Sequence, residues 1–191
     1  SPPKIYLPQS NTDAVRQMLN SFVKLDRGKM PCDLIGVSPG DEIEISRELI
    51  VNVHQTKHTV PSVGYIVSER RKKLKKEYCD LSGDEIKTLR SQGTEITTES
   101  RIPLIGFTGD TSPAGLDNNP EFYEAKILIT EMTFISPEHR KELIHKNGHM
   151  HLDDFIARQE KFNNEVSIAG HFSTRHSLHQ SKKREHTHTH T

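Results

Sequence analysis

The chain lacks tryptophan, has only two cysteines and is poor in hydrophobic residues. Hydrophobic side chains make up 32% of its 191 residues, so any core is thin. Cys32 and Cys79 show neither zinc-finger spacing nor a catalytic partner pattern, which favours inert free thiols in a reducing compartment. No apolar run approaches the ~18 residues needed to span a bilayer, so the sequence predicts no membrane association.

The chain also lacks an excess of charge and an initiator methionine. Lysines and arginines number 26, as do aspartates and glutamates, so attraction to a polyanion has to come from a local patch. The chain begins at Ser1 and shows no signal peptide. We therefore expect a fragment of a cytoplasmic protein, with nuclear and organellar locations left open.

Strand and helix patterns alternate along the chain, which predicts a layered α/β fold. The helix expected after Asn11 or Thr12 has one apolar face for a core, and a second begins at Ser82 or Asp84. Two more are predicted, from Ser136 to about Lys146 and from Asp153 or Asp154 through Phe162. Apolar runs predict strands at 5–7, 35–37, 42–45, 49–53, 64–67, 104–107, 126–130 and 166–170.

Three candidate metal ligands follow predicted strands. Leu104 to Phe107 predict a short buried strand that Gly109 ends just before Asp110, and α/β folds place their chemistry at such strand ends. His58 and His171 lie in comparable positions. Histidines with a bridging carboxylate suit a pair of metal ions. Spacing alone leaves two interpretations of Asp110, as a ligand or as a turn former.

One stretch of the chain is strongly basic. Residues 69–101 predict a polar insertion between two core strands. Its basic run comprises Arg70, Arg71, Lys72, Lys73, Lys75 and Lys76. Composition alone leaves open whether this run is a solvated surface or binds a phosphate backbone. It also leaves open whether Tyr78 stacks on a base or packs on its own segment.

Five motifs occur in order along the chain: His58-Thr59-Val60-Pro61-Ser62-Val63-Gly64-Tyr65, Phe107-Thr108-Gly109-Asp110-Thr111, Glu131-Met132-Thr133-Phe134, Gly148-His149 and His171-Phe172-Ser173-Thr174-Arg175. This set resembles tRNase Z, the tRNA 3′-processing endonuclease, and is closest to its short form. The likeness covers roughly residues 2–178. It implies an α/β fold, the C-terminal part of an incomplete metallo-β-lactamase αββα sandwich, with a basic arm at about 69–101 and a disordered tail at 179–191.

The resemblance implies roles for five site residues. His58 and His171 each bind one of two Zn²⁺ ions, and Asp110 bridges both. His149 assists catalysis by giving a proton to the leaving oxygen, with support from Glu131. The implied partners are precursor tRNA and, through the first strand and helix, a second copy in a homodimer. Arg175 is expected to contact a phosphate, and the arm to grip tRNA through Arg70, Arg71, Lys72, Lys73, Lys75 and Lys76.

The chain also departs from the family pattern. The His-x-His-x-Asp-His motif, which supplies the remaining ligands, is expected to precede Ser1. Residues 149–154 resemble it superficially, and we interpret them as the family's Gly-His loop rather than a relocated zinc motif. His176 replaces a usual tyrosine. We therefore expect a chain truncated at both ends and inactive alone. The alternatives are a non-catalytic RNA-binding subunit and another hydrolase of the same fold.

Overall fold

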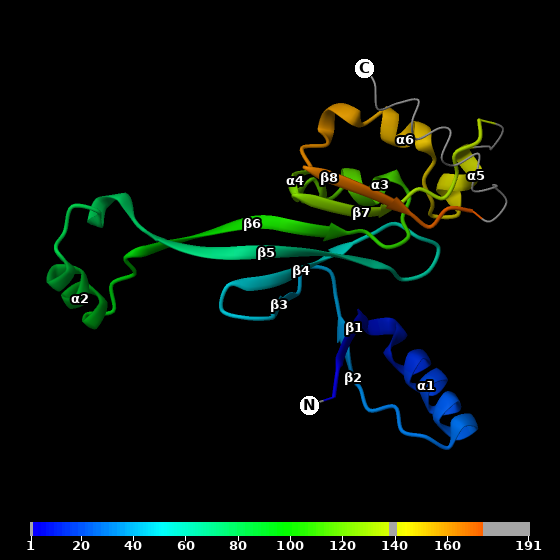
Figure 1. Ribbon diagram of the computed structural model, residues 1–191, viewed down its shortest axis with the longest axis horizontal. Coiled ribbons are helices and arrows are strands. Elements are labelled where there is room, and N and C mark those ends of the chain that lie inside the picture. Colours follow the sequence, from blue (N-terminus) through cyan, green and yellow to red (C-terminus); the bar gives the residue numbers. More distant parts are fainter. Residues whose placement is uncertain (1, 138–140, 174–191) are drawn as a thin grey trace.

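The computed structural model describes residues 2–137 and 141–173, and its centre is a six-stranded sheet (Figure 1). The strand order is β3-β4-β5-β6-β7-β8, in which the first four pair antiparallel and β6, β7 and β8 pair parallel. The strands are β3 (Glu42–Glu44), β4 (Leu49–Gln55), β5 (Val63–Leu74), β6 (Thr97–Phe107), β7 (Ile127–Glu131) and β8 (Val166–Gly170).

Short helices cover one face of this sheet and form the core with it. The fully buried ring of Phe122 lies over two glycines, because a Cβ atom at Gly64 or Gly106 would come within 2.8 or 2.9 Å of it. Around it pack Ile66, Leu116, Tyr123, Leu128 and Met150. The helices are α3 (Pro113–Asp117), α4 (Glu121–Glu124), α5 (Lys141–Lys146), α6 (Leu152–Ile156) and the 3-10 turn η3 (Gln159–Lys161).

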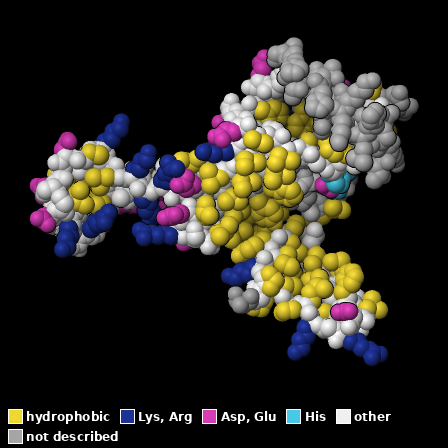
Figure 2. All heavy atoms as spheres, viewed as in Figure 1, with side chains coloured by type: hydrophobic (Ala, Val, Ile, Leu, Met, Phe, Trp, Pro, Cys, Tyr) yellow, Lys and Arg dark blue, Asp and Glu magenta, His cyan; other side chains and the backbone are white. Residues whose placement is uncertain are grey.

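The opposite face of the sheet is apolar but open. Phe107 pairs with Ile129, and Ile129 pairs with Ile168, so the three side chains share this face. Phe107 and Ile168 are each 47% exposed, and hydrophobic side chains gather over this region in Figure 2. The predicted short buried strand at 104–107 is therefore wrong in two ways. It is longer, and only one of its faces is covered, as in one half of an αββα sandwich.

A small unit at the N-terminal end lies beside the sheet. β1 (Lys4–Pro8) and β2 (Asp33–Val37) pair parallel, and the turn η1 (Gln9–Asn11) and α1 (Thr12–Asp26) connect them. No residue of α1 is buried, and Leu25 is 83% exposed. The prediction that this helix packs an apolar face on a core is thus wrong for the described residues.

The basic segment is an extension of the sheet. β5 and β6 stay paired as far as Leu74 and Thr97, and the turn η2 (Lys76–Tyr78) and α2 (Gly83–Ser91) close the protruding arm (Figure 1). Ser82 begins α2 with a capping box, as predicted. The strand predicted at 64–67 is too short, because β5 continues through the charged residues and stays paired with β6 as far as Leu74.

Two other predictions change near the end of the chain. Phe162 lies beyond α6, which ends at Ile156. The helix predicted from Ser136 is described only as α5, Lys141–Lys146, because residues 138–140 lie outside the described ranges. Arg175, His176 and the 179–191 tail also lie outside them. Within residues 2–137 and 141–173, no helix is both long and apolar enough to cross a membrane.

Candidate metal centre

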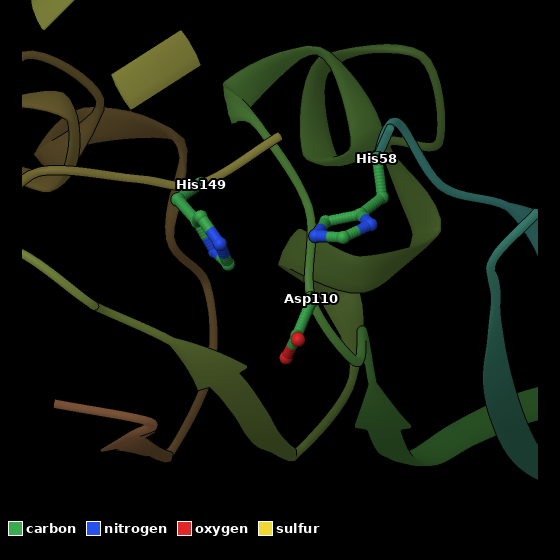
Figure 3. Close-up of side chains that lie close together, drawn as sticks. All are labelled: His58, Asp110 and His149. Atoms are coloured by element: carbon green, nitrogen blue, oxygen red, sulfur yellow. The ribbon is translucent and has the colours of Figure 1, made fainter. Parts of the chain in front are cut away.

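The candidate ligands meet at one edge of the sheet because their strands run in the same direction. β4, β6, β7 and β8 all point toward this edge, since β5 is antiparallel to β4 and β6. His58 follows β4, Asp110 follows β6, and His171 follows β8. His149 reaches the same place from the loop after α5, and Figure 3 shows it facing His58 and Asp110.

The side chains at this edge form two overlapping clusters with the chemistry of a metal site. The potential ligand atoms of His58, Asp110 and His149 all lie within 4.8 Å of one another, and so do those of Glu131, His149 and His171. Asp110 Oδ2 lies 3.5 Å from His171 Nε2, which joins the clusters. Imidazole nitrogens and carboxylate oxygens are donors that zinc accepts, so the residues fit zinc. The structure thus brings the three predicted ligands together, with His149 between them.

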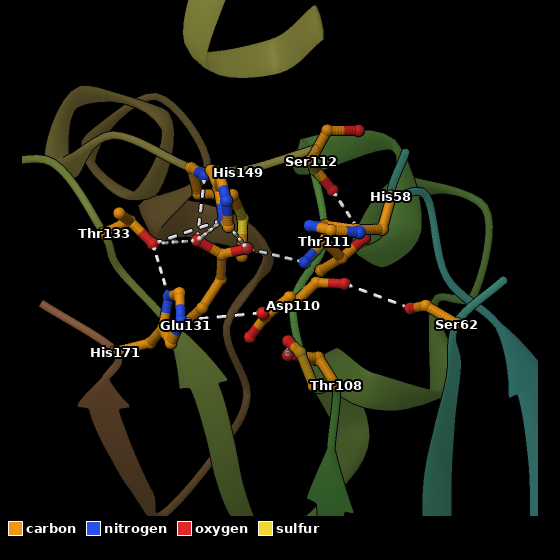
Figure 4. A network of polar contacts seen from close by, with 12 residues as sticks. His58, Ser62, Thr108, Asp110, Thr111, Ser112, Glu131, Thr133, His149 and His171 are labelled. Atoms are coloured by element: carbon orange, nitrogen blue, oxygen red, sulfur yellow. Dashed lines mark hydrogen bonds and ion pairs between the residues drawn. The ribbon is translucent and has the colours of Figure 1, made fainter. Parts of the chain in front are cut away.

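Glu131 holds this arrangement from behind. Its side chain is 1% exposed, and both of its oxygens lie 3.1–3.2 Å from His149 Nδ1. The backbone N–H groups of Thr111 and Met150 donate to it over 2.6 and 3.2 Å. A buried carboxylate needs such donors to offset its lost hydration. Glu131 is therefore a buried hydrogen-bond partner of His149 (Figure 4).

The loop that carries His58 is tied to the loop that carries Asp110. The Lys57 N–H donates to Thr111 Oγ1 over 2.9 Å, and the Ser112 N–H donates to the Lys57 carbonyl over 2.8 Å. The Ser62 hydroxyl donates to the Asp110 carbonyl over 3.1 Å (Figure 4). These contacts link the loops of two candidate ligands that are far apart in sequence.

His151 belongs to the fold and not to the metal cluster. Its ring is 1% exposed. Nδ1 accepts from the Asp153 N–H over 3.0 Å and caps α6, while Nε2 donates to the Ser136 carbonyl over 2.8 Å. Both ring nitrogens are used, so neither offers a lone pair to a metal. This geometry favours the Gly-His loop interpretation of residues 149–154.

The main contributor that sequence reasoning missed is Thr133. Its hydroxyl lies against Glu131, His149 and His171. The residue stood inside a recognised motif, but a single threonine carries no signal of its own. Thr111 was missed as well, because its two contributions, a backbone N–H group toward Glu131 and a hydroxyl group toward Lys57, leave no pattern in the sequence.

Sequence comparisons find that the chain is similar to curated tRNase Z proteins. It is 36% identical to tRNase Z TRZ1 of Arabidopsis thaliana over 179 residues, covering 93% of this chain and 64% of the relative. It is 33% identical to the chloroplastic tRNase Z TRZ2 of the same plant, covering 95% of this chain and 52% of the relative. The chain is a relative of tRNase Z. It spans between half and two thirds of the length of these proteins.

Solved structures establish the fold. The short form of human tRNase Z, ELAC1, superposes with a TM-score of 0.56 at 17% identity, covering 92% of this chain and 63% of that one. The metallo-β-lactamase fold protein YhfI of Bacillus subtilis superposes with a TM-score of 0.54 at 16% identity, covering 95% of this chain and 56% of that one. No family model matches the sequence. The predicted resemblance and the incomplete metallo-β-lactamase fold are both confirmed.

Within the arm, the basic residues fall into two groups. The Arg70 side chain is 15% exposed, lies 3.0 Å from Glu44 and donates to the Arg47 carbonyl. The neighbouring Glu69 carboxylate, 2.8 Å away, raises the pKa of Arg71. In contrast, none of the four lysines makes an ion pair with a described residue, so their charges remain available. These are Lys72, Lys73, Lys75 and Lys76.

Proposed function

We propose that the protein containing this chain is a zinc-dependent endoribonuclease that removes 3′ trailers from tRNA precursors. The carrying observation is the convergence of His58, Asp110, His149 and His171 on one sheet edge, backed by the buried Glu131. The chain spans 64% and 52% of the two Arabidopsis relatives. The proposed activity therefore belongs to the protein that includes the remaining part of the fold.

Three residues would hold the metal. His58, Asp110 and His171 fit two Zn²⁺ ions, with Asp110 between the histidines. We assign the remaining ligands to a His-x-His-x-Asp-His segment outside these 191 residues. When bound, zinc supplies an activated water and neutralises charge that develops on the phosphate.

His149 and Glu131 form the proposed proton-donating pair. His149 Nδ1 lies 3.1 Å from the nearer Glu131 oxygen, so Nδ1 carries hydrogen and donates to the carboxylate. Nε2 is then the nitrogen left for the substrate. We assign His149 the role of giving a proton to the 3′ oxygen that leaves the cleaved bond.

The proposed partners are precursor tRNA and a second copy of the protein. The four arm lysines supply positive charge for RNA phosphates, and each such pairing adds sequence-independent affinity. The apolar side of α1 supports a homodimer, since Met18, Phe22 and Leu25 are 51%, 53% and 83% exposed. A cytoplasmic location stays a prediction.

The test uses the gene product that contains this chain, zinc and a precursor tRNA with a 3′ trailer. We expect cleavage at the trailer boundary, abolished by Asp110→Ala and by a chelator, and unchanged by Asp80→Asn in the arm. Tight RNA binding without cleavage would instead support a non-catalytic subunit. Hydrolysis of simple phosphodiesters without tRNA cleavage would support another hydrolase.

The isolated 191-residue chain provides a second comparison. We expect little or no cleavage by it, because half of the proposed ligands lie elsewhere. Cleavage at the rate of the full gene product would contradict the assignment of those ligands to another segment.

A further inference from the structure

One buried hydroxyl group joins the three polar side chains at the back of the site. Thr133 is 6% exposed, and its Oγ1 lies 2.5 Å from Glu131 Oε2, 2.9 Å from His171 Nδ1 and 3.4 Å from His149 Nδ1 (Figure 4). A hydroxyl has a single hydrogen to donate. The direction of each of these contacts therefore constrains the others.

The direction follows from Glu131. Two backbone N–H groups lie against its carboxylate, one at each oxygen. A backbone N–H group can only donate a hydrogen bond. Both carboxylate oxygens are thus acceptors, and the Thr133 hydroxyl donates its single hydrogen to Oε2. Toward His171, Thr133 then offers only a lone pair. His171 Nδ1 must carry the hydrogen of that 2.9 Å contact.

We propose that Thr133 is a positioning residue that sets the tautomer of His171. With hydrogen on Nδ1, the neutral ring keeps a lone pair on Nε2, the nitrogen that lies 3.5 Å from Asp110 Oδ2. That is the nitrogen a metal shared with Asp110 needs. The metal part of this inference rests on the proposed function. The tautomer part rests on the hydrogen bonds alone.

The other contacts of the His171 ring, stacking on His149 at 5.4 Å between centroids and the approach of Asp110, do not determine which ring nitrogen carries hydrogen. The side chain is 50% exposed, and the residue has a left-handed backbone with a φ of 60°, a strained conformation for histidine. The backbone does bring the partners together, since the Met132 N–H donates to the Gly170 carbonyl over 2.8 Å and the Ser173 N–H to the Thr133 carbonyl over 2.9 Å. At this distance, the Thr133 hydroxyl determines which ring nitrogen of His171 carries hydrogen.

The experiment compares Thr133→Val, Thr133→Ser and Thr130→Val with the wild type. Serine keeps the hydroxyl, whereas valine removes it at nearly constant volume. Thr130 is a matched control, because it is also buried and its hydroxyl bonds only to Thr108 in the described part of the chain. The intact gene product is labelled with ¹⁵N-histidine, and NMR reads the protonated ring nitrogen of His171 without metal or RNA. Zinc affinity is measured by competition with a chelating dye.

We expect hydrogen on His171 Nδ1 in the wild type, Thr133→Ser and Thr130→Val, and a mixture of tautomers in Thr133→Val. Zinc binding should weaken about 10–100-fold in Thr133→Val alone. Hydrogen on Nε2 in the wild type overturns the inference without recourse to any variant. Unchanged tautomer and affinity in a folded Thr133→Val also overturn it. A protein that shows the expected tautomers but cleaves no tRNA contradicts only the proposed function.

Discussion

The backbone of Gly148 lies directly against His58. A Cβ atom built on Gly148 would come within 2.6 Å of His58 Cα and 2.8 Å of its ring Cδ2, and Gly148 has a φ of 80°. The neighbouring residue His149 places its ring 5.1 Å from that of His58 between centroids. Two segments that are far apart in the chain thus approach this closely only because one of them has no side chain.

Gly148→Ala should therefore damage the site more than the fold. The variant incurs about 1 kcal/mol of strain for its left-handed backbone and also displaces either His58 or His149. Gly93→Ala is the matched control, with a φ of 79° and no atom within 4 Å of the added Cβ. We expect Gly148→Ala to lose at least as much stability as Gly93→Ala in denaturant unfolding, and only Gly148→Ala to lose zinc affinity. Equal zinc affinity in the two variants would contradict the importance of this contact.

Asp117 should make stability depend on acid pH. The Arg158 guanidinium, 2.6 Å away, and Lys161, 2.9 Å away, hold the pKa of Asp117 well below its usual range. A lowered folded-state pKa gives stability that is present above the unfolded-state value of about 3.9 and is lost as pH falls below it.

Asp117→Asn should thus lower the free energy of unfolding by about 1–2 kcal/mol at pH 7, and by less at pH 3. Glu165→Gln is the control, because its 3.7 Å ion pair with Lys126 is largely exposed and contributes little. Urea unfolding at both pH values measures the difference. A constant difference between pH 7 and pH 3 would show that the charge of Asp117 is not responsible.

The arm lysines should bind RNA through charge alone. Lys72→Ser with Lys73→Ser should weaken precursor tRNA binding and make the plot of log affinity against log salt shallower by about 0.7–0.9 for each phosphate that is no longer neutralised. The exposed pair Lys24→Ser with Lys29→Ser removes the same charge from the N-terminal unit. The same change of slope in both double variants would mean that net charge, and not the arm, governs binding.

His151 and His149 should respond oppositely to substitution. Asparagine is among the best residues for capping a helix, so His151→Asn should retain zinc binding and activity. His151→Ala should lose more stability than the ~1 kcal/mol of a cap alone, because it also removes a buried ring and the donor to the Ser136 carbonyl. His149→Asn should fold normally but lose cleavage. Thermal unfolding and the tRNA cleavage assay distinguish these outcomes. Loss of zinc from a folded His151→Asn would revive the interpretation of residues 149–154 as a zinc motif.

Local signals in the sequence were enough for much of the fold. Apolar runs located β7 and β8, and helical spacing with a Ser82 cap located α2, because these elements depend on near neighbours. The same signals misjudged β6, whose apolar face lacks a covering layer. They also misjudged α1, since periodicity shows that a helix has an apolar side but not what covers it.

By itself, the sequence determined which residues to expect at the site, because ordered motifs contain His58, Asp110, Glu131, His149 and His171. Only the tertiary structure decided that these side chains lie together. The parallel ends of β6, β7 and β8 bring loops from distant parts of the chain to one edge. There, the single hydrogen of Thr133 and the missing side chain of Gly148 determine which atoms face one another. Such constraints act across space, so no local pattern records them.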